Sequence, residues 1–270
     1  MSQFEDEAIK ATVELGKEVA SDLVKPTAQS VGNNIGLFVD GAMGWLGYWG
    51  EKQKIKREVY LKQYKQTISK NIEEIPSDKL IEPAAHIVGP AIEASKYHIE
   101  EPTCRDMFAK LIASACNADL ESDTHPSFPD IVRQLSPTDA KFLALFRSHS
   151  YYPAASIKEL HKDGIVTPYP YMMFDLGTEQ TDFPYYKDLE LTSTVELLER
   201  FGLLVKNDEV LALDYDYESF RNNWFYKILE KGFKSDSEVV IHKYRLELSV
   251  MGKKFLKCCV PEKFSDVNEG

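Results

Sequence analysis

The sequence predicts a mainly α-helical protein, with an N-terminal multi-helix domain followed by a winged-helix-like α/β unit. Helix-start signals are dense between Leu80 and Leu145. From Ser136 the chain then reads as three helices, two strand-like runs and a last helix, which is the order of a winged helix. The 270 residues, of which 43% are hydrophobic, can bury a substantial core. We therefore divide the chain into residues 1–25, 26–135, 136–262 and 263–270.

Residues 1–25 are predicted to form one amphipathic helix. Ser2 and Glu5 have the spacing of a capping box, and Lys25-Pro26 marks the end of the helix. We expect this helix to pack on the main domain, and the alternative is a detached helix that binds a partner. The acidic, polar beginning is not typical of a signal peptide, so a cytoplasmic location is expected.

Residues 31–50, VGNNIGLFVDGAMGWLGYWG, are rich in glycine and aromatic residues and carry one charge, Asp40. The segment is expected to be buried packing or an irregular loop. The alternative is peripheral membrane contact on activation, with aromatic rings in the interface and basic residues on anionic headgroups. A permanent membrane span is not expected, because the longest apolar run falls far short of about 20 residues. The candidate membrane or partner contacts are Leu37, Phe38, Trp45, Leu46, Trp49, Lys52, Lys54, Lys56 and Arg57.

The basic run after this segment is predicted to continue as a helix to about Ile75. We expect its lysines to form a solvent-exposed face of this helix. A landing site for a lipid surface, RNA or an acidic partner is the alternative.

Four helix starts are predicted between Leu80 and Leu145. Ser136 can cap a helix that Pro137 opens and that Asp139 completes as a capping box. Ser127 repeats this arrangement, and Pro102 opens a further helix. Pro83 is expected to open another helix, which the Gly89-Pro90 pair should kink or split. Short helices with tight corners, and hence a compact helical domain, are predicted.

Residues 136–262 are assigned to the winged-helix-like unit. Helices are expected over 136–147, 155–161, 191–205 and 249–259, and strands over 209–213 and 239–248. Residues 163–189 and 214–237 are long insertions, and 263–270 form a flexible tail. The third helix displays Glu196 and Glu199, which would repel phosphate. Specific DNA binding is therefore not expected, and protein contact or dimerisation is favoured.

The middle of the chain resembles the Abi-alpha family of bacterial abortive-infection proteins. The matching stretches are KPTAQSVGNNIG (25–36), LIEP (80–83), IVGPAIEASKY (87–97), RDMFAKLIAS (105–114), HPSF (125–128) and QLSPTDAK (134–141). The motif residues are Glu82, Pro83, Gly89, Pro90, Tyr97, His125, Pro126, Ser127, Phe128, Ser136, Pro137 and Asp139. The resemblance covers about half the chain and implies a role in phage defence. It supplies no catalytic residues.

Composition and motifs favour a binding function. The net charge of −11 argues against broad nucleic-acid binding. The four cysteines lack metal-ligand spacing, and no phosphate-binding loop, nucleophile elbow or zinc motif occurs in the sequence. We therefore expect no catalytic residues, no metal and no cofactor. The prediction is an anti-phage protein that contacts a phage or host protein, with homo-oligomerisation and peripheral membrane contact left open. A winged-helix transcriptional regulator is the alternative.

Overall fold

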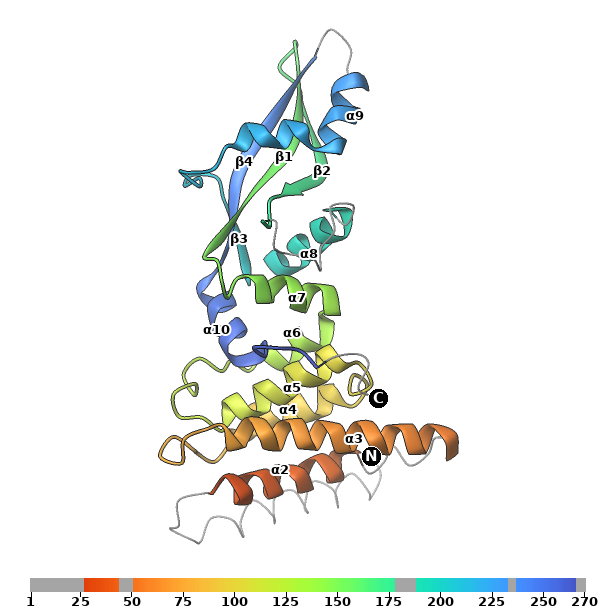
Figure 1. The fold of residues 1–270 in the computed structure, drawn as a ribbon, viewed down its shortest axis with the longest axis vertical. Coiled ribbons are helices and arrows are strands. Elements are labelled where there is room, and N and C mark those ends of the chain that lie inside the picture. Colours follow the sequence, from red (N-terminus) through yellow and green to blue (C-terminus); the bar gives the residue numbers. More distant parts are fainter. Residues whose placement is uncertain (1–26, 44–50, 178–187, 233–236, 266–270) are drawn as a thin grey trace.

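The computed structural model describes residues 27–43, 51–177, 188–232 and 237–265 (Figure 1). The molecule is elongated, with helices stacked at one end and a curled antiparallel sheet at the other (Figure 1). The helix expected over residues 1–25 lies outside the described residues.

Among the described residues, six consecutive helices form most of the helical end. They are α2 (Ala28–Met43), α3 (Glu51–Glu73), α4 (Ala85–Ser95), α5 (Pro102–Ala115), α6 (Phe128–Gln134) and α7 (Pro137–Leu145). Helix α2 lies along α3, with Val31, Ile35 and Val39 buried at a spacing of four residues. Asp40 of α2 forms an ion pair with Lys65 of α3.

Local cap chemistry sets several of these helix starts. Ser136 accepts a hydrogen bond from the Asp139 N–H, and the Asp139 carboxylate accepts one from the Ser136 N–H, so the predicted capping box is confirmed. Helix α5 begins at Pro102 as predicted. Ser127 makes no side-chain cap hydrogen bond at α6, so that detail was wrong. Pro90 lies inside α4 and does not split it.

Helix α5 is the centre of the helical end. It packs against α3, α4, α6, α7 and α10 (Val250–Cys259), and it buries even charged side chains. Arg105 donates to the Gln63 side-chain oxygen at 2.8 Å, and the Asp106 carboxylate accepts from the Ser265 N–H at 2.6 Å. The chain at Ser265 therefore lies back at the helical end of the molecule.

The predicted winged-helix-like unit is wrong. The second of its helices, expected over residues 155–161, is part of strand β1 (Tyr151–His161). This strand pairs with β2 (Val166–Phe174) and with β4 (Ser237–Leu248), and β4 also pairs with the short β3 (Leu204–Asn207), which gives the order β2-β1-β4-β3. No described residue in 209–213 forms the expected strand. The protein is therefore an α/β molecule with a four-stranded antiparallel sheet among its described residues, and not a mainly α protein ending in a winged helix.

Both faces of the sheet are covered, which explains why β1 lacks a strand-like alternation in sequence. Helix α8 (Asp188–Arg200) packs on one face, and η4 (Tyr217–Asn222) and α9 (Trp224–Gly232) pack on the other. Ala154 and Ala155 are both fully buried, one on each face. A strand buried on both sides needs apolar or small residues at consecutive positions, and these resemble a helix in sequence.

Helix α10 joins the sheet to the helices. Strand β4 ends at Leu248, and Ser249 caps α10 by accepting from the Gly252 N–H at 2.8 Å. Ser114 of α5 donates to the Cys258 carbonyl at 2.9 Å. One continuous apolar cluster runs from α2 through α5 and α10 to the α8 face of the sheet.

Gly252→Ala should destabilise the protein by about 1–3 kcal/mol, as overpacking does. A Cβ at position 252 would lie 2.0 Å from the Leu203 carbonyl oxygen, which is rigid backbone. Chemical denaturation measures the effect, and Gly36→Ala in α2 is the control. Nothing lies within 4 Å of a Cβ at Gly36, and alanine is the better helix former, so the control should be neutral or gain about 0.5–1 kcal/mol. Equal stabilities for the two variants would contradict the close packing.

Candidate binding site on the sheet

The register of the sheet brings together polar side chains that are far apart in the sequence. Ser156 of β1 pairs with Met172 of β2 and with His242 of β4. Tyr244 lies two residues further along β4. Lys206 of β3 pairs with Leu246, which lies two residues beyond Tyr244. Because side chains alternate between faces, these residues share the α8 face of the sheet.

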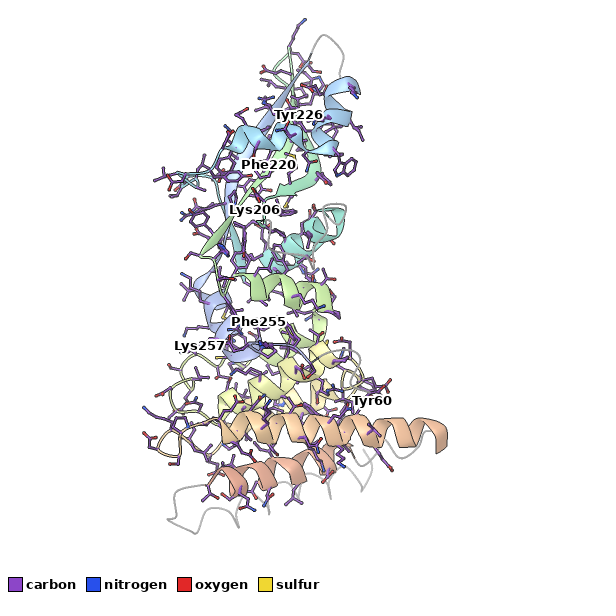
Figure 2. The ribbon with its side chains drawn as sticks, viewed as in Figure 1. Tyr60, Lys206, Phe220, Tyr226, Phe255 and Lys257 are labelled. Atoms are coloured by element: carbon purple, nitrogen blue, oxygen red, sulfur yellow. The ribbon has the colours of Figure 1, made fainter. Side chains whose placement is uncertain are left out.

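A cavity of about 270 Å³ opens at this position. Its lining residues are Ser156, Tyr169, Met172, Lys206, Asp208, His242 and Tyr244. Lys206 lies in the part of the sheet next to α8 (Figure 2). The volume approaches the lower end of the range typical of ligand pockets, and the lining combines aromatic, apolar and polar groups as ligand pockets do.

The Tyr244 hydroxyl is the most informative atom of the cavity. Tyr244 is 2% exposed, and its hydroxyl has no hydrogen-bond partner among the described residues. Burial raises the pKa of Tyr244, and the negative charge of Glu199 raises it further, so the hydroxyl stays protonated at neutral pH. A buried hydroxyl without a partner costs about 1–3 kcal/mol, and a ligand that accepts its hydrogen bond would recover this energy.

The charged groups of the cavity are already paired. Lys206 Nζ lies 2.6 Å from Glu199 Oε2 of α8, and His242 Nε2 lies 3.4 Å from Asp208 Oδ2. The rings of His242 and Tyr244 lie 6.0 Å apart at 52°. The cavity therefore combines the Tyr244 side chain with a Lys206–Glu199 ion pair and a His242–Asp208 contact, which suits an uncharged polar group.

The opposite face holds β4 in place behind the cavity. Tyr217 of η4 donates to the Tyr244 carbonyl at 3.1 Å and accepts from the Ala212 N–H at 3.2 Å. Phe220 and Tyr226 bury their rings in the same apolar cluster (Figure 2). The Tyr244 backbone is thus held from the α9 face of the sheet, whereas its side chain lies on the α8 face.

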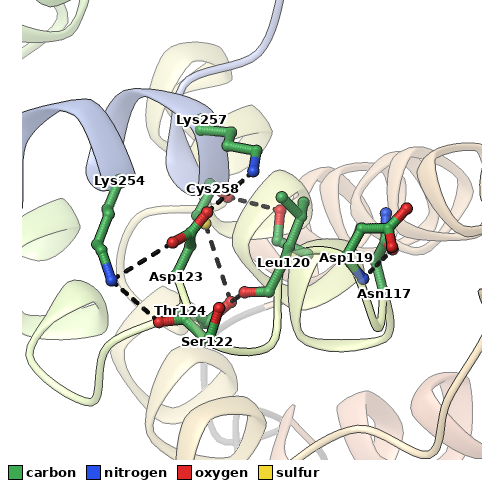
Figure 3. Close-up of polar contacts among 10 residues, drawn as sticks. Asn117, Asp119, Leu120, Ser122, Asp123, Thr124, Lys254, Lys257 and Cys258 are labelled. Atoms are coloured by element: carbon green, nitrogen blue, oxygen red, sulfur yellow. Dashed lines mark hydrogen bonds and ion pairs between the residues drawn. The ribbon is translucent and has the colours of Figure 1, made fainter.

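A second polar cluster lies where α10 meets residues 117–124 (Figure 3). Asp123 pairs with Lys257 at 2.9 Å and with Lys254 at 3.4 Å, and these lysines, Lys257 first, hold the pKa of the carboxyl below its usual range. Thr124 contacts the Cys258 sulfur at 3.9 Å. Each of these groups has a partner, so the cluster holds α10 in place and is not a candidate site.

The cysteines are unreactive by environment. Cys104 and Cys116 are buried, and burial raises the pKa of each thiol to about 12. Burial also raises the pKa of Cys258 and Cys259. Thiols of this kind carry little thiolate at neutral pH and make poor nucleophiles. No group of three or more His, Cys, Asp or Glu side chains in the described ranges is placed to hold a metal ion.

The motif residues of the sequence analysis lie in the helical end, away from the cavity. Ser136 and Asp139 cap α7, and Thr194 of α8 donates to Asp139 at 2.6 Å. His125 Nδ1 accepts from the Ser127 N–H at 3.1 Å, next to the buried Phe128. Glu82, Pro83, Gly89, Pro90, Tyr97, Pro126 and Pro137 lie in α4, in α7 or in the turns around the helices. They build the helical end and do not line the cavity on the sheet.

The candidate membrane or partner contacts are only partly described. Leu37 on α2 is 64% exposed. Trp45, Leu46 and Trp49 lie outside the described residues, as do the side chains of Phe38, Lys52, Lys54, Lys56 and Arg57. Within the described part of the chain no helix combines the length and apolar character needed to cross a membrane.

Sequence reasoning did not find the cavity. Its side chains come from four strands, one of which was read as a helix and one as part of an insertion. The only local signal was the alternation in IHKYRLEL of β4, which places His242 and Tyr244 on one face. Their neighbours on that face could be identified only once the register of the sheet was known.

A family model described as abortive infection alpha matches residues 56–259. The matched region includes most of the helical end and the whole sheet. No curated protein and no solved structure matches the chain.

Tyr244→Phe should leave the free energy of unfolding unchanged or raise it by up to about 1 kcal/mol, because it removes a buried hydroxyl without a partner. Tyr217→Phe is the matched control on the other face. It should lower the stability by about 1–2 kcal/mol, since it removes a hydroxyl that makes two hydrogen bonds. Urea denaturation of both variants measures the difference. A loss for Tyr244→Phe as large as that for Tyr217→Phe would mean that the Tyr244 hydroxyl is satisfied in the free protein.

Proposed function

Since the chain belongs to the abortive infection alpha family, we propose that it acts in abortive infection by binding a protein partner, of phage or host origin, rather than by catalysing a reaction. The partner binds at the cavity on the α8 face of the sheet. The helical end holds that sheet in place through α10 and α7.

The observation that carries this proposal is the Tyr244 hydroxyl. Tyr244 lines an open cavity, and its hydroxyl is buried and has no partner among the described residues. Buried polar groups in folded proteins nearly always have a partner, so each exception calls for an explanation. A ligand that accepts from Tyr244 supplies one.

The paired charges favour binding over catalysis. A general base or nucleophile needs a group poised to exchange a proton with the substrate. Lys206 is engaged by Glu199, and His242 by Asp208. The Lys206–Glu199 pair leaves that lysine without a free charge to attract an anionic competitor.

The winged-helix regulator that the sequence left as an alternative loses its structural basis. The segment expected to be its second helix is β1, and the third helix, α8, packs across the sheet.

Tyr244→Phe should lower protection against phage about two- to tenfold in a plaque assay, because one hydrogen bond to a ligand contributes about 0.5–1.5 kcal/mol. Ser156→Phe, which fills the cavity, should abolish protection. The assay uses the bacterial strain in which the wild-type chain protects. Ser148→Phe, a bulky residue at an exposed serine outside the cavity, is the control and should protect fully. Full protection by Tyr244→Phe and Ser156→Phe, both folded and expressed at wild-type level, would rule out the cavity as the binding site.

A further inference from the structure

Strand β4 is paired along most of its length on one edge but only near its end on the other edge. Strand β1 pairs with β4 from Ser237 to Glu247. On its other side β4 pairs with β3 only from Arg245 to Leu248. Tyr217 and Glu218 of η4 contact the next two residues, Tyr244 and Lys243. Residues 237–242 of β4 thus have one edge that no strand of the described chain covers.

The end of β4 shows which of its residues form hydrogen bonds toward β3 and which toward β1. The Ser249 N–H donates to the Leu203 carbonyl at 3.0 Å, so the odd-numbered residues of β4 bond toward β3. The pairing with β1 is continuous along β4, so this phase holds to the far end. Val239 and Ile241 therefore direct their N–H and C=O groups outward at the uncovered edge.

The other edge of the sheet is closed. The Asp175 N–H donates to the Pro153 carbonyl, and the His161 N–H to the Ile165 carbonyl, so the even-numbered residues of β2 at either end face outward. One of these is Pro168, which has no N–H, and another is Met172, whose N–H donates to the Thr192 hydroxyl at 3.1 Å. Natural sheets protect their edges in such ways. The contrast singles out residues 237–242 of β4 as a stretch of edge that no described strand covers.

Side chains along the open edge differ between the two faces. On the α8 face lie His242, with Asp208 beside it, and the cavity. On the α9 face lie Val239 and Ile241, whose side chains belong to the apolar cluster there. The segment between β3 and η4 is tied to β4 at His242 and Tyr244, and it exposes the apolar Leu213 at 96%. An incoming strand would meet an apolar face on one side and a polar cavity on the other.

We propose that the partner binds as an extended polypeptide segment that adds a strand to the open edge of β4 at Val239–Ile241, with apolar residues on the α9 face and an uncharged polar side chain in the cavity. This inference rests on the proposed function and names the chemistry of its ligand.

The edge of β4 and the cavity beside it both favour a polypeptide as the ligand. The outward N–H and C=O groups match an extended backbone, which supplies both acceptors and donors at the strand spacing. The cavity selects the side chain. An asparagine, glutamine, serine or threonine can accept from Tyr244, whereas an anionic side chain would find Lys206 already paired with Glu199.

Proline substitution tests the edge without disturbing the ladder between β1 and β4. Val239→Pro removes one outward N–H and no hydrogen bond to β1, because proline is tolerated where the N–H faces solvent. It should abolish phage protection while the melting temperature falls by no more than a few degrees. Val166→Pro makes the same change at an outward position of the closed β2 edge and should protect like the wild type. Val240→Lys, which adds a charge at the open edge without altering the backbone, serves as a second variant and should also lose protection.

Tagged wild-type protein from phage-infected cells then reports the contact itself. Hydrogen-exchange mass spectrometry should show slower exchange in peptides covering residues 237–243 than in protein from uninfected cells, and Val239→Pro should carry no bound partner. Full protection by the folded Val239→Pro and Val240→Lys variants would overturn strand addition. A captured partner without slower exchange at 237–243, or no captured partner under conditions of full protection, would do the same.

The outcomes separate the two proposals. If Ser156→Phe abolishes protection and both edge variants protect, the cavity binds a ligand that is not an added strand. If the edge variants abolish protection and Ser156→Phe and Tyr244→Phe protect, an added strand binds without using the cavity. Full protection by all four variants would reject both proposals.

Discussion

The passage from β4 into α10 is the constraint on which the arrangement of the molecule depends. Gly252 lies against the Leu203 carbonyl, in a space that no side chain can share. Ser249 at the same point caps α10 and also donates to the Gly202 carbonyl. The end of the sheet, the turn after α8 and the start of α10 are therefore held by one set of contacts. Helix α10 then packs on α5 and α6, so the sheet projects from the helices in a fixed direction (Figure 1).

Strand β3 is short because it begins directly after the turn at Gly202 and ends at Asn207. Helix α8 ends in a turn at Gly202, whose φ of 67° suits glycine, and β3 begins directly afterwards. After Asn207 the chain leaves the sheet and crosses to the other face, where Tyr217 reaches back to β4. Strand β4, paired with β1 along its length, continues well beyond the point where β3 ends. The cavity and the open edge both arise from this difference in length.

Features that depend on neighbouring residues could be predicted from the sequence, and features that depend on distant pairing could not. The capping box at Ser136 and the proline start at Pro102 are local, and both were found. The run ASIKELH contains good helix formers, yet it pairs residue by residue with β4 and forms β1. Tertiary pairing overrides weak local preference in such a segment. The candidate site was missed for the same reason, since Ser156 and His242 become neighbours only through that pairing.

Residue-resolved hydrogen exchange on the free protein tests most directly whether the edge of β4 at residues 237–242 is uncovered. Amides bonded to β1, those of Val240, His242 and Tyr244, should be strongly protected. The outward amides of Val239 and Ile241 should exchange much faster, so that protection alternates along the strand. Uniform strong protection from Val239 to Tyr244 would show that the edge is already covered in the resting protein and would contradict the account.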